Sequence, residues 1–389
     1  MNICILKESM IIGGTERSAA NTSEVISQDH KLWIALYDAS QMMYSCAGNV
    51  IDFRLPPRNS TIGKIINTFL RDVMLRKLIK NKKIEILYTF TTIGNRQTRY
   101  KYDTIKIISA RDFGAISKKH STYFKALKNS SAMICNSEYT RQFFLTRYPE
   151  QSDKVYTVYN YINTKEIVNQ AKERIDSQCA EFIERHSSTI VSVGRFCREK
   201  GFEYLIESVA HAREKDKDIG LVLVGDGEYR QKYLDLVEHF ELQDYVYFTG
   251  FQRNPYKYMA RCSCFVLSSR SEGFPNVLAE AMALGLPAIA TNCYSGPAEI
   301  LRKDADYSVV KDTYIECDYG ILSPAFKDDD NQIAINELSN AMIKLLSDKQ
   351  LCDKYRSLSA QRSLDFSEEA TRNRLNGIFN MLKERRDAR

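Results

Sequence analysis

The stretch Ser271–Pro287, SEGFPNVLAEAMALGLP, fixes the expected layout of the C-terminal half of the chain. Gly273 and Pro275 predict a loop, and the run 276–283, which begins with Asn276, predicts a helix. The short apolar run 264–267 just before it predicts a buried parallel strand. We therefore expect a strand, a loop and a helix in succession.

This layout carries two carboxylates, Glu272 on the loop and Glu280 on the helix. A helix N-terminus offers unpaired N–H groups and a positive dipole end, which attract phosphates and hydroxyl-rich ligands. A ligand that touches both carboxylates must be elongated, and a nucleotide sugar has that shape. The alternative is that Glu280 is a capping or solvated carboxylate on an ordinary amphipathic helix.

Length and composition predict a soluble protein of two domains. The chain has 389 residues, of which 44% are hydrophobic and 27% charged. It contains no apolar run long enough to cross a bilayer and no signal peptide at its start, so we expect a cytoplasmic protein. The ten cysteines and five histidines are scattered without metal-ligand spacing, and we expect no metal.

Charge is distributed unevenly along the chain. Residues 1–165 hold 25 Lys and Arg against 13 Asp and Glu, a net charge of +12, whereas the whole chain has +6. The basic half therefore favours an acidic partner.

The N-terminal half alternates between expected strands and helices, which argues for a parallel sheet. The first strand leads into Gly13 and Gly14 and then a helix start, a weak form of a phosphate-binding turn. The alternative is a loop that needs glycine for its backbone alone. The expected strands are 2–6, 32–35, 84–88, 105–108, 132–135 and 155–158.

One predicted helix, residues 63–83, is strongly basic. Its apolar positions, among them Ile65, Phe69 and Leu78, are expected to share one face, with seven Lys and Arg around it against the single acid Asp72. Such a helix suits an anionic membrane surface. It equally suits a helix that covers a sheet and turns its lysines to water.

A second alternation follows a polar segment around 160–178, where we place the domain linker. The expected strands are 189–193, 221–224 and 246–248, ahead of the strand 264–267. Glycine-containing loops follow the first three, GRFCREKG, GDG and GFQRNP.

Five motifs of this half occur in order: VGRFCREKGFEYLIES, LVLVGDGEY, VYFTGFQRNPYKYM, SEGFPNVLAEAMALGLP and GPAEIL. Together with GGTER, ICNSEYTRQFF and KVYTVYN in the first half, they resemble glycosyltransferase family 4, the retaining GT-B sugar transferases of group 1. The resemblance implies an α/β protein of two Rossmann-like domains facing across a central cleft. We expect residues 1–165 to form the acceptor domain, completed by a helix at 366–389, and residues 166–365 to form the nucleotide-sugar donor domain.

The resemblance also implies roles for particular residues. Arg195 and Lys200 would neutralise the donor diphosphate, and Glu272 would hold the transferred sugar, so these three are the expected catalytic residues. Glu280 would accept hydrogen bonds from the ribose. The remaining expected donor contacts are Gly14, Gly250, Phe251, Gly273, Phe274, Pro275 and Asn276.

The implied reaction retains the anomeric configuration and needs neither a cofactor nor a metal. Since no D-x-D motif marks a magnesium site, Arg195, Lys200 and helix N-termini must stabilise the leaving diphosphate. We expect a nucleotide-diphosphate sugar, a UDP-sugar, as the donor substrate.

The acceptor half departs most from the family pattern. Arg111 and Asp112 are candidate acceptor contacts or a strand-end ion pair, and Ser137 touches phosphate or caps a helix. The segment 302–318 is longer than the usual turn and has no assigned role.

We therefore expect a glycosyltransferase that moves a hexose or N-acetylhexosamine onto a glycan, lipid-linked, in the synthesis of a surface polysaccharide such as a capsule or O-antigen. Its partners would be the nucleotide sugar, a polyprenol-diphosphate-linked glycan and an anionic membrane surface on the inner face of the plasma membrane, with no nucleic acid. Two alternatives stay open: transfer to a soluble acceptor, and a catalytically silent nucleotide-sugar-binding subunit.

Overall fold

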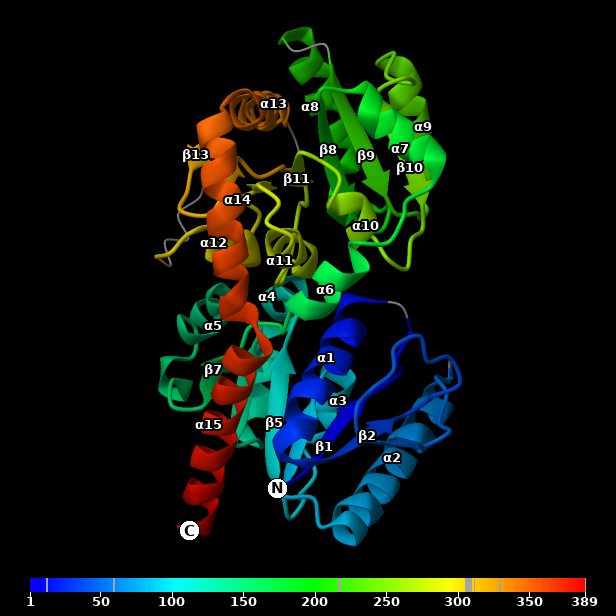
Figure 1. The fold of residues 1–389 in the computed structure, drawn as a ribbon. Coiled ribbons are helices and arrows are strands. Elements are labelled where there is room, and N and C mark those ends of the chain that lie inside the picture. Colours follow the sequence, from blue (N-terminus) through cyan, green and yellow to red (C-terminus); the bar gives the residue numbers. More distant parts are fainter. Residues whose placement is uncertain are drawn as a thin grey trace. The chain divides into compact units, whose positions relative to one another are not determined.

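The computed structural model describes residues 1–11, 13–58, 60–215, 218–304, 310, 312–328 and 330–388. The chain divides into two units, each built on a seven-stranded sheet (Figure 1). Unit 1 consists of Met1–Tyr161 and Glu368–Arg389, and unit 2 of Ile162–Ser367. Of the long segment 302–318, residues 305–309 and 311 lie outside the described residues.

The sheet of unit 1 is parallel throughout, in the order β3-β2-β1-β4-β5-β6-β7. Its strands are β1 (Asn2–Lys7), β2 (Lys31–Leu36), β3 (Asn49–Asp52), β4 (Ile86–Thr89), β5 (Ile105–Ala110), β6 (Ala132–Cys135) and β7 (Val155–Thr157). Its helices are α1 (Gly14–Asp29), α2 (Thr61–Lys82), α3 (Thr92–Gln97), α4 (Phe113–Lys128), α5 (Glu138–Leu145), the 3-10 turn η1 (Pro149–Gln151) and α15 (Glu368–Asp387).

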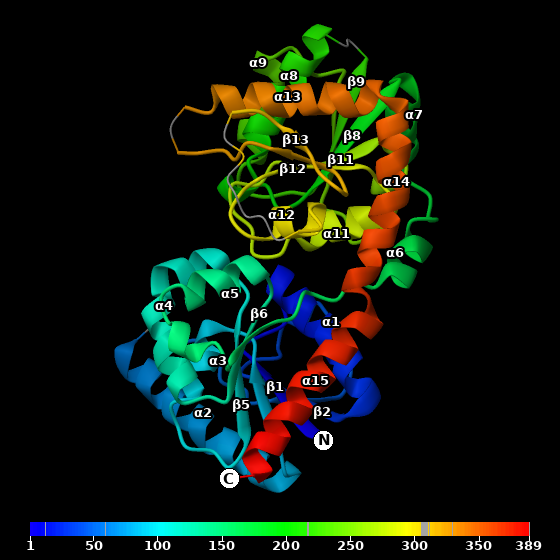
Figure 2. The same cartoon turned by 90° about the vertical axis from the view of Figure 1, so that its left-hand side faces the viewer.

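Alternate side chains of β1 serve the two faces of this sheet, as the pleat requires. Ile3 and Ile5 belong to one buried cluster, with side chains of α1 and α15, whereas Cys4 and Leu6 belong to another, with side chains of α2. The C-terminal helix α15 lies beside α1 (Figure 2), where Asn376 Nδ2 donates to Asp29 Oδ2 at 2.7 Å. The last helix of the chain therefore completes the fold of unit 1.

Unit 2 has the strand order β10-β9-β8-β11-β12-β14-β13, parallel except for the pair β13 and β14. Its strands are β8 (Ser188–Val193), β9 (Ile219–Val224), β10 (Val246–Gly250), β11 (Cys264–Leu267), β12 (Ala288–Thr291), β13 (Ile315–Glu316) and β14 (Ile321–Ser323). Its helices are α6 (Thr164–Gln170), α7 (Ser177–Arg185), η2 (Arg198–Lys200), α8 (Phe202–Lys215), α9 (Arg230–His239), α10 (Tyr256–Met259), α11 (Asn276–Ala283), α12 (Gly296–Leu301), α13 (Gln332–Ser347), α14 (Lys349–Ser363) and η3 (Leu364–Phe366).

Among their parallel strands, both sheets reverse the strand order once, between β1 and β4 in unit 1 and between β8 and β11 in unit 2. In doubly wound sheets, ligands bind outside the carboxyl ends of the strands at this reversal. The strand–loop–helix layout expected for 264–283 is confirmed as β11, a loop and α11. The loops after β8 and β11 are therefore the first place to look for a site.

The boundary between Tyr161 and Ile162 lies within the segment around 160–178, where the domain linker was predicted, and this segment also contains α6 and the start of α7. One expectation needs correction. The apolar residues of the basic helix do not share one face: Leu78 is buried, whereas Ile65 and Phe69 are 65% exposed. In α2 both the core-facing and the solvent-facing sides carry apolar residues. The sequence pattern was interpreted as one apolar face, because it was not divided between the two sides.

Candidate functional site

The loop after β8, residues 194–201, is held in shape by glycines. Gly201 has φ +59°, and a Cβ there would lie 2.4 Å from the carbonyl oxygen of Ser268. Gly225, in the loop after β9, has φ +150°, and its Cβ would lie 1.9 Å from the carbonyl oxygen of Gly194. Only glycine permits these approaches without displacing backbone. The three loops after β8, β9 and β11 are thus in direct backbone contact.

Hydrogen bonds join the loop after β8 to the loop after β11. Ser268 Oγ donates to the carbonyl oxygen of Lys200 at 2.9 Å, and the backbone N–H of Arg270 donates to that of Glu199 at 2.8 Å. These bonds fix the carboxylate-bearing loop relative to the cation-bearing loop.

Lys200 and Glu272 form an ion pair across the two loops. Lys200 Nζ lies 2.6 Å from Glu272 Oε1, and Ser269 Oγ donates to the same oxygen at 2.7 Å. The side chains are 24% and 12% exposed. Burial lowers the pKa of Lys200, but the Glu272 carboxylate outweighs it, and the net shift is upward. The lysine therefore remains an ammonium ion at neutral pH, within reach of a ligand anion.

The segment Gly273–Pro275 is anchored to the start of α12. Ser295 Oγ donates to the carbonyl oxygen of Gly273 at 2.6 Å, and the backbone N–H of Gly296 donates to it at 3.1 Å. Ser295 has φ +82°, a backbone conformation that residues other than glycine seldom adopt. Strained residues of this kind persist where surrounding structure holds them, often at functional sites.

Helix α11 begins directly after this loop, with Pro275 as its N-cap and no side-chain cap. Asn276 is therefore the first helical residue. Glu280 lies in the second turn and is 3% exposed, so it is not the solvated carboxylate of the alternative interpretation. Phe274 is buried and packs edge-on against Phe366, with ring centroids 5.2 Å apart.

Arg195 lies on the same loop as Lys200, in a different environment. Its side chain is exposed, and within the described residues it has no ion-pair partner. The structure thus brings Lys200 and Glu272 together, whereas Arg195 bonds to neither of them. The Cys197 thiol and the Glu199 carboxylate raise the pKa of Arg195, beside the partly buried pair of Lys200 and Glu272.

The turn after β10 adjoins these loops. Gly250 has φ +70°, and its carbonyl oxygen accepts from the backbone N–H of Gly225 at 3.0 Å. The next residue, Phe251, is 56% exposed. An exposed ring beside the loops offers a flat apolar surface on which a nucleobase can stack.

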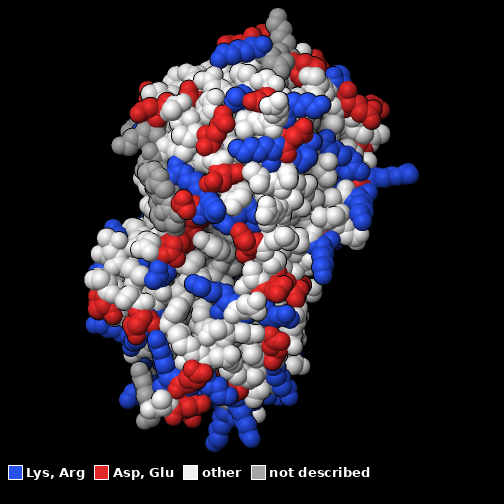
Figure 3. All heavy atoms as spheres, turned by 60° about the vertical axis from the view of Figure 1, so that its left-hand side comes forward, with Lys and Arg blue, Asp and Glu red and all other residues white. Residues whose placement is uncertain are grey.

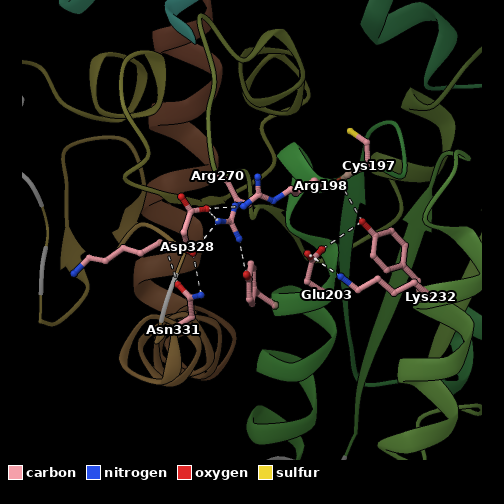
Figure 4. Close-up of polar contacts among 10 residues, drawn as sticks. Cys197, Arg198, Glu203, Lys232, Arg270, Asp328 and Asn331 are labelled. Carbon is pink, nitrogen blue, oxygen red and sulfur yellow. Dashed lines mark hydrogen bonds and ion pairs between the residues drawn. The ribbon is translucent and has the colours of Figure 1, made fainter. Parts of the chain in front are cut away.

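A carboxylate from a distant part of the chain links the same loops. Asp328 Oδ1 accepts from Arg198 Nη2 at 2.6 Å and also from Arg270, and Figure 4 shows both guanidinium groups directed at this carboxylate. Arg270 also donates to Tyr204 Oη at 2.5 Å, and the Tyr204 ring stacks on Phe326. No pattern along the chain indicates this cluster, because its members are far apart in sequence.

Comparison with known proteins decides the family. The family described as glycosyl transferases group 1 matches residues 177–316. Over 304 residues the chain is 31% identical to an uncharacterized glycosyltransferase of Methanocaldococcus jannaschii, covering 75% of this chain and 68% of that protein. The chain belongs to the group 1 glycosyltransferases. The family resemblance expected from the motifs is confirmed.

Two further comparisons extend over nearly the whole glycosyltransferase. An N-acetylgalactosamine-N,N'-diacetylbacillosaminyl-diphospho-undecaprenol 4-alpha-N-acetylgalactosaminyltransferase of Campylobacter jejuni is 25% identical over 370 residues, 91% of this chain and 92% of that protein. The crystal structure of Anabaena HepE in complex with UDP matches with a TM-score of 0.73 at 16% identity, covering 98% of this chain and 100% of that one. The expected GT-B fold class is confirmed.

In unit 1 of this glycosyltransferase, the glycine turn leads from β1 into α1. A Cβ on Gly14 would meet no atom within 4 Å, whereas one on Gly13 would lie 2.2 Å from Glu16 Oε2. Glu16 is held by Lys7, whose Nζ lies 2.8 Å away and whose side chain is 1% exposed. This pair was not predicted; its signal in the sequence is a lysine at the end of a buried strand, followed by an acid in the first helical turn.

The candidate acceptor residues have different environments. Arg111 donates to Tyr88 Oη and Ser18 Oγ at 2.8 and 2.7 Å, and its guanidinium lies 4.0 Å from the Phe90 ring centroid. It forms no ion pair with Asp112, which is exposed at the N-cap of α4 without a side-chain cap bond. The expected strand-end ion pair is therefore absent between these two described residues.

Ser137 is buried and caps α5, since its Oγ accepts from the backbone N–H of Thr140 at 3.2 Å. Of the two roles predicted for Ser137, the structure shows the helix cap.

Two properties hold for the part of the chain that the structure describes. No three His, Cys, Asp or Glu side chains are grouped so that they could hold a metal ion. None of the described helices combines the length and the apolar character needed to span a bilayer.

Proposed function

We propose that this glycosyltransferase binds a nucleotide-diphosphate sugar, a UDP-sugar, on the loops after β8, β10 and β11. The contact between Lys200 and Glu272 at the strand-order reversal carries this proposal, because it places an ammonium and a carboxylate where doubly wound sheets bind ligands. Lys200 and Arg195 would bind the diphosphate as a point charge and a bidentate donor. Phe251 and Gly250 would border the base, and the structurally similar Anabaena HepE, which was solved with UDP, supports a uracil there.

The sugar and ribose would be held by the loop and helix that follow β11. Glu272 would accept hydrogen bonds from sugar hydroxyls, with the backbone N–H groups of Gly273 and Phe274 beside it. Glu280 would accept from the ribose hydroxyls, which agrees with its burial on α11. Pro275 and Asn276 would bring the start of α11, the positive end of its dipole, to the donor.

The transfer we propose retains the anomeric configuration. The bond between the anomeric carbon and the diphosphate oxygen breaks, and its electron pair leaves with the diphosphate. The acceptor hydroxyl oxygen bonds to the anomeric carbon on the same face, and its proton passes to the departing diphosphate oxygen. Lys200 and Arg195 stabilise the charge that develops there, which is the contribution a preorganised positive site makes best. These two cations take the place of a metal ion in the proposal.

The acceptor we propose is a lipid-linked glycan in the synthesis of a surface polysaccharide, and the sugar a hexose or N-acetylhexosamine. The Campylobacter relative, whose name gives a diphospho-undecaprenol acceptor, supports this proposal. The basic N-terminal half supports it too, because such an acceptor carries a diphosphate. Arg111 and Asp112 are the proposed acceptor contacts in unit 1, and Gly14 is a proposed donor contact.

A transfer assay tests the proposal. Purified protein is incubated with labelled UDP-hexoses and UDP-N-acetylhexosamines, a polyprenol-diphosphate-linked glycan and EDTA. We expect one donor to be consumed and the new linkage to have the anomeric configuration of the donor by NMR. A product of opposite configuration contradicts retention, activity that EDTA abolishes contradicts metal independence, and UDP binding without any turnover identifies a silent subunit.

A further inference from the structure

Helix α2 presents large apolar side chains to solvent. Ile62, Ile65, Ile66, Phe69 and Val73 are 72%, 65%, 41%, 65% and 46% exposed. Their spacing of three, one, three and four residues places all five within an arc of about 100° on the helix. They form one stripe, which we call the apolar stripe.

The apolar stripe is not the side on which α2 packs. Leu75, Leu78 and Ile79 are buried in a cluster with Cys4 and Leu6 of β1, and these positions lie on the opposite side of the helix. The core of unit 1 is therefore complete without the stripe. Because exposed apolar residues at helical spacing are unusual on a monomeric protein, the stripe indicates an interaction surface.

Basic residues continue the same side of the helix toward its C-terminus. Arg76, Lys77 and Lys80 are exposed, and the helical period places them in line with the apolar stripe. The single acid of the helix, Asp72, is buried and bonded to Arg76 at 3.0 Å and to Tyr102 Oη at 2.8 Å. Lys and Arg side chains, with Asp and Glu among them, also gather at the end of unit 1 where α15 terminates (Figures 1 and 3).

We propose that the solvent-facing side of α2 docks on an anionic lipid bilayer, with the apolar stripe in the boundary between headgroups and acyl chains. Arg76, Lys77 and Lys80 would then bind headgroup phosphates. An apolar stripe alone would fit a protein partner equally well, but its basic continuation and the +12 charge of residues 1–165 favour an acidic planar surface. The inference rests on the proposed function in one respect, since a lipid-linked acceptor places the enzyme at a bilayer.

The two halves of α2 would act differently. Electrostatic attraction brings the enzyme to the surface and weakens as salt is added, because the Debye length shortens. Insertion of Phe69 and the isoleucines removes apolar area from water and depends little on salt. A surface that used charge alone would lack this second component.

Vesicle flotation of the full chain tests the inference, with vesicles of phosphatidylcholine alone or mixed with phosphatidylglycerol. We expect wild-type protein to float with the mixed vesicles. The double variant Ile65→Ser with Phe69→Ser should lose at least about tenfold in partitioning, at low and high salt alike. The variant Lys77→Gln with Lys80→Gln should lose partitioning chiefly at low salt.

Ile333→Ser is the matched control, because Ile333 is a similarly exposed isoleucine, 56%, on a helix of unit 2. It should float like the wild type. Equal flotation of wild type and stripe variant overturns the inference. So does a wild-type oligomer that the stripe variant converts to monomer without any vesicle binding, since the stripe would then cover a second copy.

UDP binding by the same variants separates this inference from the proposed function. Stripe variants that bind UDP like the wild type are folded, and their flotation reports on α2 alone. If neither the wild type nor any variant binds UDP, the donor proposal fails. The flotation result still decides the role of α2.

Discussion

Lys200 Nζ lies 2.6 Å from Glu272 Oε1 and so connects the loops that follow β8 and β11. Other contacts also fix these loops: Gly201 lies against the carbonyl oxygen of Ser268, and the carbonyl oxygen of Gly273 accepts from Ser295 Oγ. The pair is therefore preorganised and does not hold the loops together by itself. In the proposed donor complex, the diphosphate would share the Lys200 ammonium with Glu272, and both groups would lie at the junction of phosphate and sugar.

The raised pKa of Lys200 predicts how stability depends on pH. An unperturbed lysine has a pKa of 10.5. Because the folded-state pKa lies above that value, the ion pair contributes its full stability below pH 10.5 and loses it as pH rises through the folded-state pKa. The difference in unfolding free energy between wild type and Lys200→Met should be constant from about pH 7 to 9 and shrink above about pH 10.5. Urea unfolding at several pH values measures it, and a difference that grows at alkaline pH contradicts the assignment.

Gly225→Ala should damage both stability and donor binding. The new Cβ would lie 1.9 Å from the carbonyl oxygen of Gly194, so the loop that carries Arg195 must move. We expect a loss of about 2–4 kcal/mol in unfolding free energy. The matched control is Gly377→Ala in α15, where a Cβ meets no atom within 4 Å. That change should stabilise the protein by about 0.5–1 kcal/mol, because alanine favours helix. Chemical denaturation of both variants checks the contrast.

Glu280 should determine recognition of the ribose. If its carboxylate accepts from the ribose hydroxyls, wild-type enzyme binds UDP about tenfold or more tightly than 2'-deoxy-UDP, and Glu280→Ala removes most of this preference. Competition titration of each protein with the two nucleotides measures the ratio. Wild-type enzyme that fails to distinguish the nucleotides would remove the ribose role from Glu280.

Asp328 should act as a positioning residue through Arg198 and Arg270. In Asp328→Asn both guanidinium groups lose their carboxylate, so the KM for the donor should rise about two- to tenfold. Stability should change by less than about 1 kcal/mol, because the Asp328 side chain is 77% exposed. Asp353→Asn, which breaks a surface ion pair of α14 with Arg356, is the control and should leave KM unchanged. An equal rise in both variants would show a general effect of surface charge.

Much of the fold was predictable because its central strands are continuous apolar runs. β1, β8, β9 and β11 were all located from such runs, as buried parallel strands allow. The missed strands lack that signal: β3 is mostly exposed, and β12 is the short run AIAT directly after a proline. The pairing of short strands such as β14 depends on their neighbours in the sheet, so their sequences carry little signal of it.

The candidate site was predictable only in part. Motif resemblance located Lys200 and Glu272, but their contact joins residues 72 positions apart and needed the structure. Asp328 was invisible for the same reason, since its partners lie 130 and 58 positions away. The two apolar sides of α2 were predicted as one face, because the apolar positions were not divided between the core-facing and the solvent-facing side. Physical patterns along the chain report local burial, whereas side-chain partners depend on topology.

Calorimetric titration with UDP tests the central claim most directly. The account predicts that wild-type enzyme binds UDP in the presence of EDTA, and that Arg195→Ala and Lys200→Ala each weaken binding by at least about tenfold, since each removes a charge-assisted contact to the diphosphate. Lys232→Ala is the control, because Lys232 already pairs with Glu203 at 3.2 Å, and it should bind UDP like the wild type. Wild-type protein that does not bind UDP, or binding that neither loop substitution weakens, would contradict the account.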